Sequence, residues 1–350
     1  MNGFVNIRLM KNNEANIVLN LLKSSFPLTQ SVFCNLTRHV LVAEFKGKII
    51  GGVVLRMFNI TKKKLGMISW IFTTKEARGK GIASKLVDKS ISYLKKRGCR
   101  EILACIDGLN TASSKLFAKK KFRANSLFTQ IKRWGLDYFS VLKESNQLFS
   151  LGSFVWTYPK KSLKDHKWFD VSISIFSNFL IGLLIFLSPL SFWIKSSLLG
   201  IFFSLVLIHL VRFFSAKIAS FTLKTKVLFR SWPSGYFFSL FLGIFGVYFP
   251  MPGNFYPKKS TWVYEKYKKS LAKISISAVS GLLLLVGVSS YFANSIAFFN
   301  TLKYLGLSVL LFDLLLVFHP FRNFNGRRIY DYNKTIWILF LLASISLFFL

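Results

Sequence analysis

The chain has 350 residues, of which 52% are hydrophobic, and a length of this order predicts about two domains. It carries 48 Lys and Arg against 13 Asp and Glu, which gives a formal net charge of +35. Such a charge favours nucleic acid or an anionic membrane as a partner, and the 39 Phe residues favour the membrane. We therefore expect a lipid bilayer as a partner and no nucleic acid.

The three cysteines lie in the first third of the chain at no metal-ligand spacing: Cys34, Cys99 and Cys105. They are typical of buried thiols in a reducing compartment. The first residues also lack the apolar run of a secretory signal peptide.

Residues 1–135 alternate predicted strands and helices, which indicates an α/β fold. Gly47 supplies the positive φ of one hairpin turn, and Gly98 ends the longest helix. The predicted strands are 5–9, 39–45, 49–58, 65–73, 101–106 and 122–131, and the predicted helices are 14–23, 80–96 and one that begins near Asn110.

A glycine-rich turn, Arg78-Gly79-Lys80-Gly81-Ile82-Ala83, joins a predicted strand to the longest predicted helix. Such a turn directs backbone N–H groups and the positive end of the helix dipole at one place, which suits a pyrophosphate. Glycine at such a turn is also compatible with tight packing alone, so the flanking sequence decides between the two interpretations.

The flanks resemble the GCN5-related N-acetyltransferase (GNAT) family over roughly residues 5–135. Residues 71–86 are similar to its signature segment, with an R-x-x-G-x-A core at 78–83, and residues 110–122 resemble its N-x-x-A-x-x-L-Y-x-K-x-G-F segment. The resemblance implies a mixed sheet, splayed between its fourth and fifth strands, with acetyl-CoA in the splay. It also implies the cofactor-binding residues: the backbone of Ile71, Phe72 and Thr73 for pantetheine, the turn Arg78, Gly79, Lys80, Gly81, Ile82 and Ala83 for pyrophosphate, and Asn110 and Phe117 for the CoA arm.

Two positions depart from the family pattern. Phe117 replaces the tyrosine that donates a proton in many members, and Lys121 replaces the glycine of G-F. Both departures leave the rate of acetyl transfer open. The candidate catalytic bases are Glu44 and Asp107, and for each a purely structural carboxylate remains the alternative.

Residues 136–170 form a basic joint, in which residues 151–157 are a possible last strand of the first domain. A lysine cluster closes the joint and is expected either to be solvated or to bind the inner leaflet: Lys160, Lys161, Lys164 and Lys167.

Residues 171–350 have the composition of a polytopic, all-α membrane domain, since about 20 apolar residues span a bilayer. The predicted spans are 171–194, 196–216, 274–302, 304–321 and 335–350, and residues 231–257 are expected to be re-entrant. With this re-entrant segment, the basic stretches 217–230, 258–273 and 322–334 all face the cytoplasm together with the first domain. Six full spans are the alternative.

Three segments of this half resemble the membrane core of archaeal-type site-2 proteases: 226–236, 249–256 and 321–333. The zinc site of that family needs H-E-x-x-H and a later aspartate. In one alignment, this chain has Ile208, His209 and Arg212 in place of His, Glu and His. A second alignment keeps His209 as the first His and has Leu210 and Phe213 in place of Glu and the second His. The position of the later aspartate is occupied by Asn325. We therefore expect a pseudoprotease without a metal, in which Asp313 pairs with Arg212 or Lys303, or forms a polar feature of the cleft.

Two functions from different classes remain. The first is a membrane-anchored acyltransferase that acetylates an unidentified amine with acetyl-CoA. The second is a non-catalytic, CoA-responsive adaptor that binds membrane-protein partners.

Overall fold

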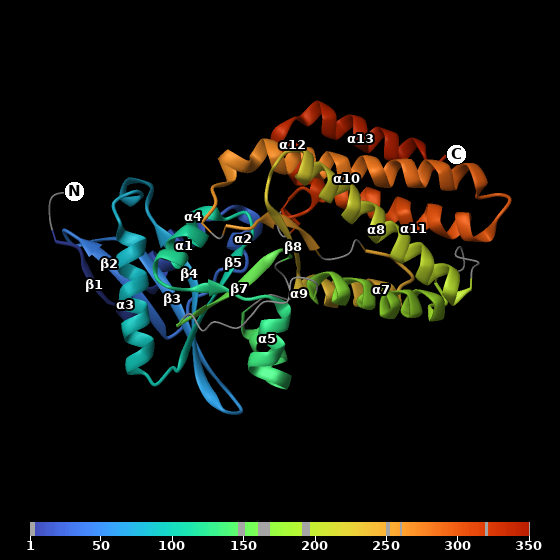
Figure 1. The fold of residues 1–350 in the computed structure, drawn as a ribbon. Helices are drawn as coiled ribbons and strands as arrows, with labels where there is room; N and C mark the ends of the chain where they lie inside the picture. The colour runs from blue at the N-terminus through green and yellow to red at the C-terminus, as the bar shows by residue number, and fades with distance from the viewer. Residues whose placement is uncertain are drawn as a thin grey trace.

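The computed structural model describes residues 4–145, 151–159, 169–190, 197–249, 253–259, 261–318 and 321–349. An α/β part extends to Tyr158, and helices that lie together on one side of it follow from Phe169 onwards (Figure 1). The predicted lysine cluster of the joint, as well as Lys195 and His319, lie outside the described residues.

The α/β part is built on one seven-stranded sheet of order β1-β2-β3-β4-β5-β7-β6. All neighbouring strands are antiparallel except β4 and β5, which are parallel. The strands are β1 (Asn6–Leu9), β2 (His39–Phe45), β3 (Lys48–Ile60), β4 (Lys63–Thr73), β5 (Glu101–Asp107), β6 (Arg123–Ala124) and β7 (Ser153–Tyr158). The helices are α1 (Ala15–Ser24), α2 (Leu28–Ser31), α3 (Ile82–Lys96), α4 (Thr111–Lys119), α5 (Leu127–Trp134) and α6 (Tyr138–Glu144).

Helices cover both faces of this sheet, because residues of a strand alternate between its faces. In β2, Val40 and Val42 belong to the apolar cluster around α1, whereas Leu41 and Ala43 belong to the cluster around α3. The sheet is therefore a buried layer, and the glycine turn before α3 follows the C-terminal end of its central strand β4.

The predicted last strand at residues 122–131 is wrong. Only β6 is extended there, and α5 follows at once, with the Ser126 hydroxyl accepting a hydrogen bond from the Thr129 N–H at 3.2 Å. Leu127 and Trp134 are buried at a helical spacing, which a short apolar run does not distinguish from a strand. The strand beside β5 is instead β7, with Cys105 paired to Val155.

Among the described residues, four helices are long and apolar enough to cross a membrane: α7 (Phe169–Leu187), α8 (Leu198–Thr222), α10 (Tyr264–Phe292) and α11 (Ala297–Leu315). The fold class expected from the sequence, a mixed sheet with flanking helices followed by a helical half, is thus confirmed. The remaining elements of this half are β8 (Val227–Ser231), α9 (Pro233–Ile244), β9 (Gly253–Pro257), α12 (Asn325–Tyr332) and α13 (Lys334–Ser346).

Two neighbouring predicted spans, 274–302 and 304–321, have the wrong boundaries. Residues 274–302 are not a single helix, because the chain turns at 293–296 between α10 and α11. Lys303, which marked a boundary in the sequence, lies inside α11 and is buried. The turn carries no charged residue, so the sequence analysis placed the break at Lys303, the next charged residue.

The segment expected to be re-entrant begins and ends in the same small sheet. β8 and β9 pair antiparallel, from Val227 with Pro257 to Ser231 with Gly253, so the chain leaves and returns at one end of the helical half. Between them, α9 has only 12 residues, and the later α13 has 13. At 1.5 Å per residue each is about 20 Å long or less, shorter than the ~30 Å of a hydrocarbon core.

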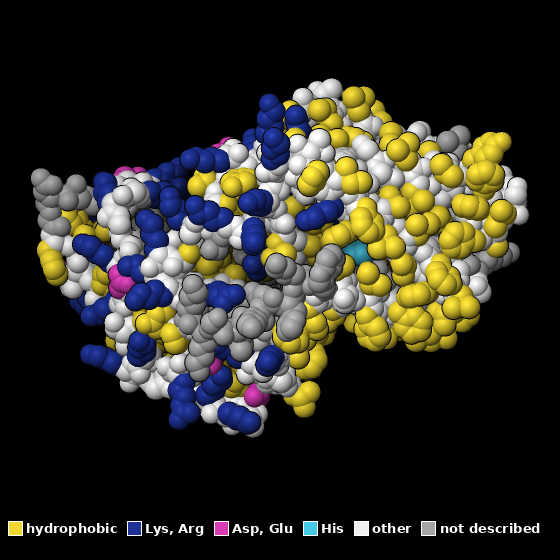
Figure 2. Space-filling model, in the orientation of Figure 1, with side chains coloured by type: hydrophobic (Ala, Val, Ile, Leu, Met, Phe, Trp, Pro, Cys, Tyr) yellow, Lys and Arg dark blue, Asp and Glu magenta, His cyan; other side chains and the backbone are white. Residues whose placement is uncertain are grey.

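The types of side chain on the surface also differ between the α/β part and the helical half. Figure 2 shows Lys and Arg side chains mostly over the α/β part and its border, and hydrophobic side chains over the helical half. Large apolar side chains are exposed there, including Phe176 on α7, Phe203 on α8 and Leu284 on α10. An exposed apolar surface on long helices is the arrangement that lipid stabilises.

Candidate functional site

The glycine turn at the start of α3 has the backbone that a phosphate cradle requires. Gly79 and Gly81 adopt left-handed conformations, with φ of +74° and +77°, which residues with a Cβ rarely adopt. An added Cβ at either would meet no described heavy atom within 4 Å, so the space before the turn is open. Arg78 and Lys80 are exposed beside it. The first N–H groups of α3 therefore point towards an accessible, positively charged place.

A gap between β4 and β5 lies next to this turn. The two strands pair only as far as Ile68 with Ala104, and opposite β3 the register shifts between Val54 and Leu55, which leaves Ser69 as an extra residue of β4. A bulge of this kind bends its strand and ends regular pairing. Beyond Ile68, no described strand pairs with the edge of β4 that faces β5, so this edge can receive another extended chain, as the sequence resemblance implied.

The gap opens into a cavity of about 560 Å³. Its walls include Ile71 from β4, Asp107 from β5, and Asn110 and Phe117 around α4, four of the residues singled out in the sequence. Phe72 is buried on the α1 face of the sheet, and neither it, Thr73 nor the turn at 78–83 lines the cavity. The cavity and the turn thus do not form one pocket.

Asn110 and Phe117 hold the two ends of α4. The Asn110 side chain caps the helix by accepting a hydrogen bond from the Ser113 N–H at 3.1 Å. Phe117 is 4% exposed and packs edge-on against Phe122, with ring centroids 4.9 Å apart. Its ring lines the cavity without offering a proton.

Lys121, at the position of the family's glycine, has a φ of +65°. The chain therefore adopts the left-handed conformation there with a residue that carries a Cβ, at a cost of about 1 kcal/mol.

Asp107 is held at the end of β5. Its Oδ1 accepts a hydrogen bond from the Leu109 N–H at 2.8 Å, and its Oδ2 accepts one from the Asn323 side chain at 3.1 Å. Both carboxylate oxygens are therefore held in place by neighbouring N–H donors.

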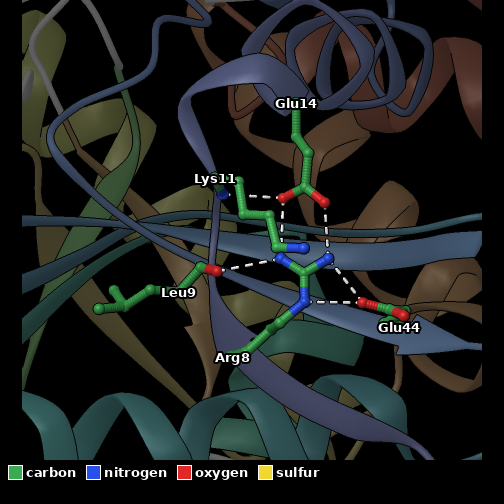
Figure 3. Close-up of polar contacts among 5 residues, drawn as sticks. All are labelled: Arg8, Leu9, Lys11, Glu14 and Glu44. Carbon is green, nitrogen blue, oxygen red and sulfur yellow. Dashed lines mark hydrogen bonds and ion pairs between the residues drawn. The ribbon is translucent and has the colours of Figure 1, made fainter. Parts of the chain in front are cut away.

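Glu44, the other candidate base, lies in a different cluster. Figure 3 shows Arg8 between Glu14 and Glu44, and the Arg8 Nε donates to Glu44 Oε2 at 2.7 Å. The same guanidinium forms two hydrogen bonds with Glu14, of 2.6 and 2.8 Å, and lowers the pKa of Glu14 to about 2. Glu44 does not line the cavity. Its contact with Arg8 connects β2 to β1.

Two residues that sequence reasoning did not select belong to the site. Cys105 lines the cavity beside Asp107. Asn323, which contacts Asp107, comes from the helical half and is separated from it by 216 residues. No pattern of local spacing relates residues so far apart, and Asn323 lies in a basic stretch of the sequence that gave no signal for this contact.

The helical half has its own buried polar cluster. Arg212 forms an ion pair with Asp313 at 3.1 Å, as one sequence interpretation expected, and the Asn325 amide donates to the same carboxylate at 2.7 Å. His209 is also buried, one helical turn before Arg212. Within the described ranges, no three His, Cys, Asp or Glu side chains gather as a metal site would require.

Comparisons with known proteins agree on the first part of the chain. The model of the Acetyltransferase (GNAT) family matches residues 19–122. The chain is 32% identical over 88 residues to the N-alpha-acetyltransferase MAK3 of Arabidopsis thaliana, covering 25% of this chain and 46% of that protein. It is 30% identical over 96 residues to an uncharacterised N-acetyltransferase of Methanocaldococcus jannaschii, covering 27% and 41%. The chain thus spans less than half the length of these relatives.

Two solved structures are among those found to be similar to this chain. A chain of the NatC complex bound to Gag peptide and CoA is 17% identical, with a TM-score of 0.33, over 45% of this chain and 99% of that one. Arabidopsis thaliana Naa50 with a bisubstrate analogue is 15% identical, with a TM-score of 0.32, over 45% and 99%. Residues 19–122 thus match the model of the Acetyltransferase (GNAT) family, and the α/β part has the mixed sheet with flanking helices of the GNAT fold.

Proposed function

We propose that this chain is a membrane-anchored N-acetyltransferase that moves the acetyl group of acetyl-CoA to an amine. The observation that carries the proposal is the left-handed glycine turn before α3, beside the gap between β4 and β5. The N–H groups of the turn, with Arg78 and Lys80, suit the pyrophosphate. The open edge of β4 at Ile71 offers backbone groups to the pantetheine arm, and the two relatives are N-acetyltransferases by name.

The chemistry needs one base and one proton donor. The amine loses a proton, its nitrogen attacks the thioester carbonyl carbon, and the C–S bond breaks as the C–N bond is completed. We assign the base to Asp107, because it lines the cavity with both oxygens held, whereas Glu44 is paired with Arg8 elsewhere. Phe117 has no proton to give, so in this proposal the CoA thiolate takes its proton from water.

In the proposal, the helical half anchors the enzyme with the acetyltransferase domain in the cytoplasm. The return of the chain from β8 to β9 supports a re-entrant segment, and this leaves the basic stretches 217–230, 258–273 and 322–334 on one side. We further infer that this half is a pseudoprotease that serves as anchor or as acceptor-binding scaffold. Its buried cluster presents Arg212 and Asn325 where a zinc site would need ligands.

The transfer of acetyl groups to an acceptor amine can be tested in cells. Mass spectrometry of acetylated amines is compared in cells that carry the protein, cells that lack it, and cells that carry Asp107→Asn. We expect a set of acetylated products that requires the intact protein. Identical acetylation in all three kinds of cells would refute the proposed acetyltransferase activity.

Phe117 also supports a second function, a CoA-responsive membrane adaptor that binds acetyl-CoA without turning it over. Release of CoA by the purified protein in the presence of amines separates the two. Tight binding of acetyl-CoA without release of CoA favours the adaptor.

A further inference from the structure

Asn323 brings a side chain of the helical half into the acetyltransferase domain. It lies between α11 and α12, and its side chain is completely buried. Its amide nitrogen donates to Asp107 Oδ2 at 3.1 Å and to the Leu151 carbonyl at 3.3 Å. Both contacts cross from one half of the chain to the other.

The orientation of this amide is determined by its neighbours. The Tyr256 hydroxyl donates to Asn323 Oδ1 at 2.8 Å and itself accepts a hydrogen bond from the Trp232 indole at 3.0 Å. The oxygen end is therefore occupied by a donor, and only the NH₂ end is left to face the carboxylate. A flipped amide would lose the Tyr256 bond and set its oxygen against Asp107.

The acetyltransferase domain has a matching hollow. A Cβ added at Gly108 would come within 2.6 Å of a Tyr256 ring carbon and 2.9 Å of Asn323 Oδ1, and one at Gly152 within 2.3 Å of the Asn323 side chain. Gly152 also has a φ of +81°. Contacts below 3 Å would force a shift, so both glycines are required for the close approach of Asn323.

The Asn323 backbone is fixed from the other side. Its carbonyl accepts a hydrogen bond from the Asn254 amide at 3.0 Å, and the same amide nitrogen donates to Asn325 Oδ1 at 3.0 Å. Asn325 in turn contacts Asp313, the partner of Arg212. Asn323 is thus anchored in the buried cluster of the helical half.

We propose that Asn323 is a positioning residue for acetyl transfer: from the helical half, it holds the Asp107 carboxylate in its ionised form and facing the cavity. The inference rests on the proposed function of Asp107 as the base. It makes the chemistry of the acetyltransferase domain depend on a group that only the helical half supplies. The amide replaces part of the water that would otherwise solvate the carboxylate, and it does so in a fixed direction.

The test compares Asn323→Ala and Asn323→Asp with Asn178→Ala in the full-length protein in detergent. Asn178 is a matched control, because it is also buried in the helical half and its Oδ1 accepts a tyrosine hydroxyl, that of Tyr248, at 2.8 Å. Acetyl-CoA binding reports that each variant is folded. Acetyl transfer is measured against pH with the best acceptor from a panel of lysine peptides, amino-terminal peptides and phosphatidylethanolamine.

We expect Asn323→Ala to lower kcat by about 10- to 100-fold, the range of a lost positioning contact, with the KM for acetyl-CoA within about twofold. The acid limb of the pH profile should move to higher pH, and further in Asn323→Asp, where two carboxyl groups face each other. Asn178→Ala should leave the acid limb and kcat unchanged. An unmoved acid limb in both Asn323 variants, or the same change in Asn178→Ala, would overturn the inference.

Infrared difference spectroscopy separates this inference from the proposed function. The carboxyl band of Asp107, identified by its loss in Asp107→Asn, should appear at a higher pH in Asn323→Ala than in the wild-type protein. This measurement needs no acceptor. Absence of transfer to every amine refutes the proposed function, whereas an Asp107 band that titrates identically in Asn323→Ala refutes the positioning role.

Discussion

The glycine turn offers the sharpest perturbation, Gly81→Glu. Gly81 is the N-cap of α3, is exposed, and has a φ of +77° with no described atom within 4 Å of an added Cβ. The substitution therefore displaces no neighbour. Its conformational cost is the left-handed backbone alone, about 1–2 kcal/mol.

The effect on acetyl-CoA should be electrostatic. The new carboxylate would stand where we place the pyrophosphate, and two unit charges about 4 Å apart repel by ~1 kcal/mol in water and ~4 kcal/mol at an effective dielectric constant of 20. This range corresponds to affinity weakened between about fivefold and about a thousandfold. The exposed turn favours the lower part of the range.

Gly98→Glu is the matched control. Gly98 follows the other end of α3 and has a φ of +81°, again with no described atom within 4 Å of an added Cβ. Strain and charge change equally in the two variants. A carboxylate is less favourable at the C-terminal end of a helix, so Gly98→Glu should lower the Tm at least as much as Gly81→Glu.

Calorimetric titration of acetyl-CoA into the full-length protein measures the difference. We expect weak binding by Gly81→Glu, binding close to wild type by Gly98→Glu, and a small loss by Gly81→Ala, which keeps the strain without the charge. Equal affinity of Gly81→Glu and wild type, or an equal loss in Gly98→Glu, would refute the phosphate cradle.

Three further results are expected. Acetyl-CoA should protect Cys105 from thiol reagents, because this residue lines the cavity; labelling at an unchanged rate would place the cofactor elsewhere. In a background without native cysteines, an impermeant reagent added outside cells should label Ser295→Cys and spare Lys259→Cys, both exposed positions, and the reverse pattern would favour six spans. Elemental analysis should find no stoichiometric zinc, because the arginine beside His209 repels a dication; zinc that His209→Ala removes would contradict this.

Much of the α/β fold followed from local signals. The hairpin at Gly47 and the end of α3 at Gly98 are set by positive φ values of +74° and +81°, which favour glycine whatever surrounds it. The gap between β4 and β5 came from family resemblance, and the bulge at Ser69 supplies its physical cause. Local sequence was sufficient to predict the structure wherever a single residue determined the backbone conformation.

The sequence-based predictions were wrong where contacts between residues far apart in the sequence determine the structure. Residues 127–134 have a pattern compatible with strand or helix, and the choice depends on β7, which occupies the place beside β5. The turn at 293–296 has neither charge nor proline to mark it. For the candidate site, Asp107 was selected from the sequence as a candidate base, but its partner Asn323 was not selected, because a contact across 216 residues leaves no local pattern.

The position of Asn323 late in the sequence has a consequence for the protein during its synthesis. The sheet is complete once Tyr158 has been synthesised, but Asn323 follows about 165 residues later. At about 5–20 residues per second, roughly ten to thirty seconds separate them. During that interval the nascent domain has its glycine turn and its cavity, but Asp107 lacks its amide partner. The proposed positioning role therefore implies that the acetyltransferase reaches its full rate only after the helices have assembled, and that unassembled chains acetylate the amines around them more slowly.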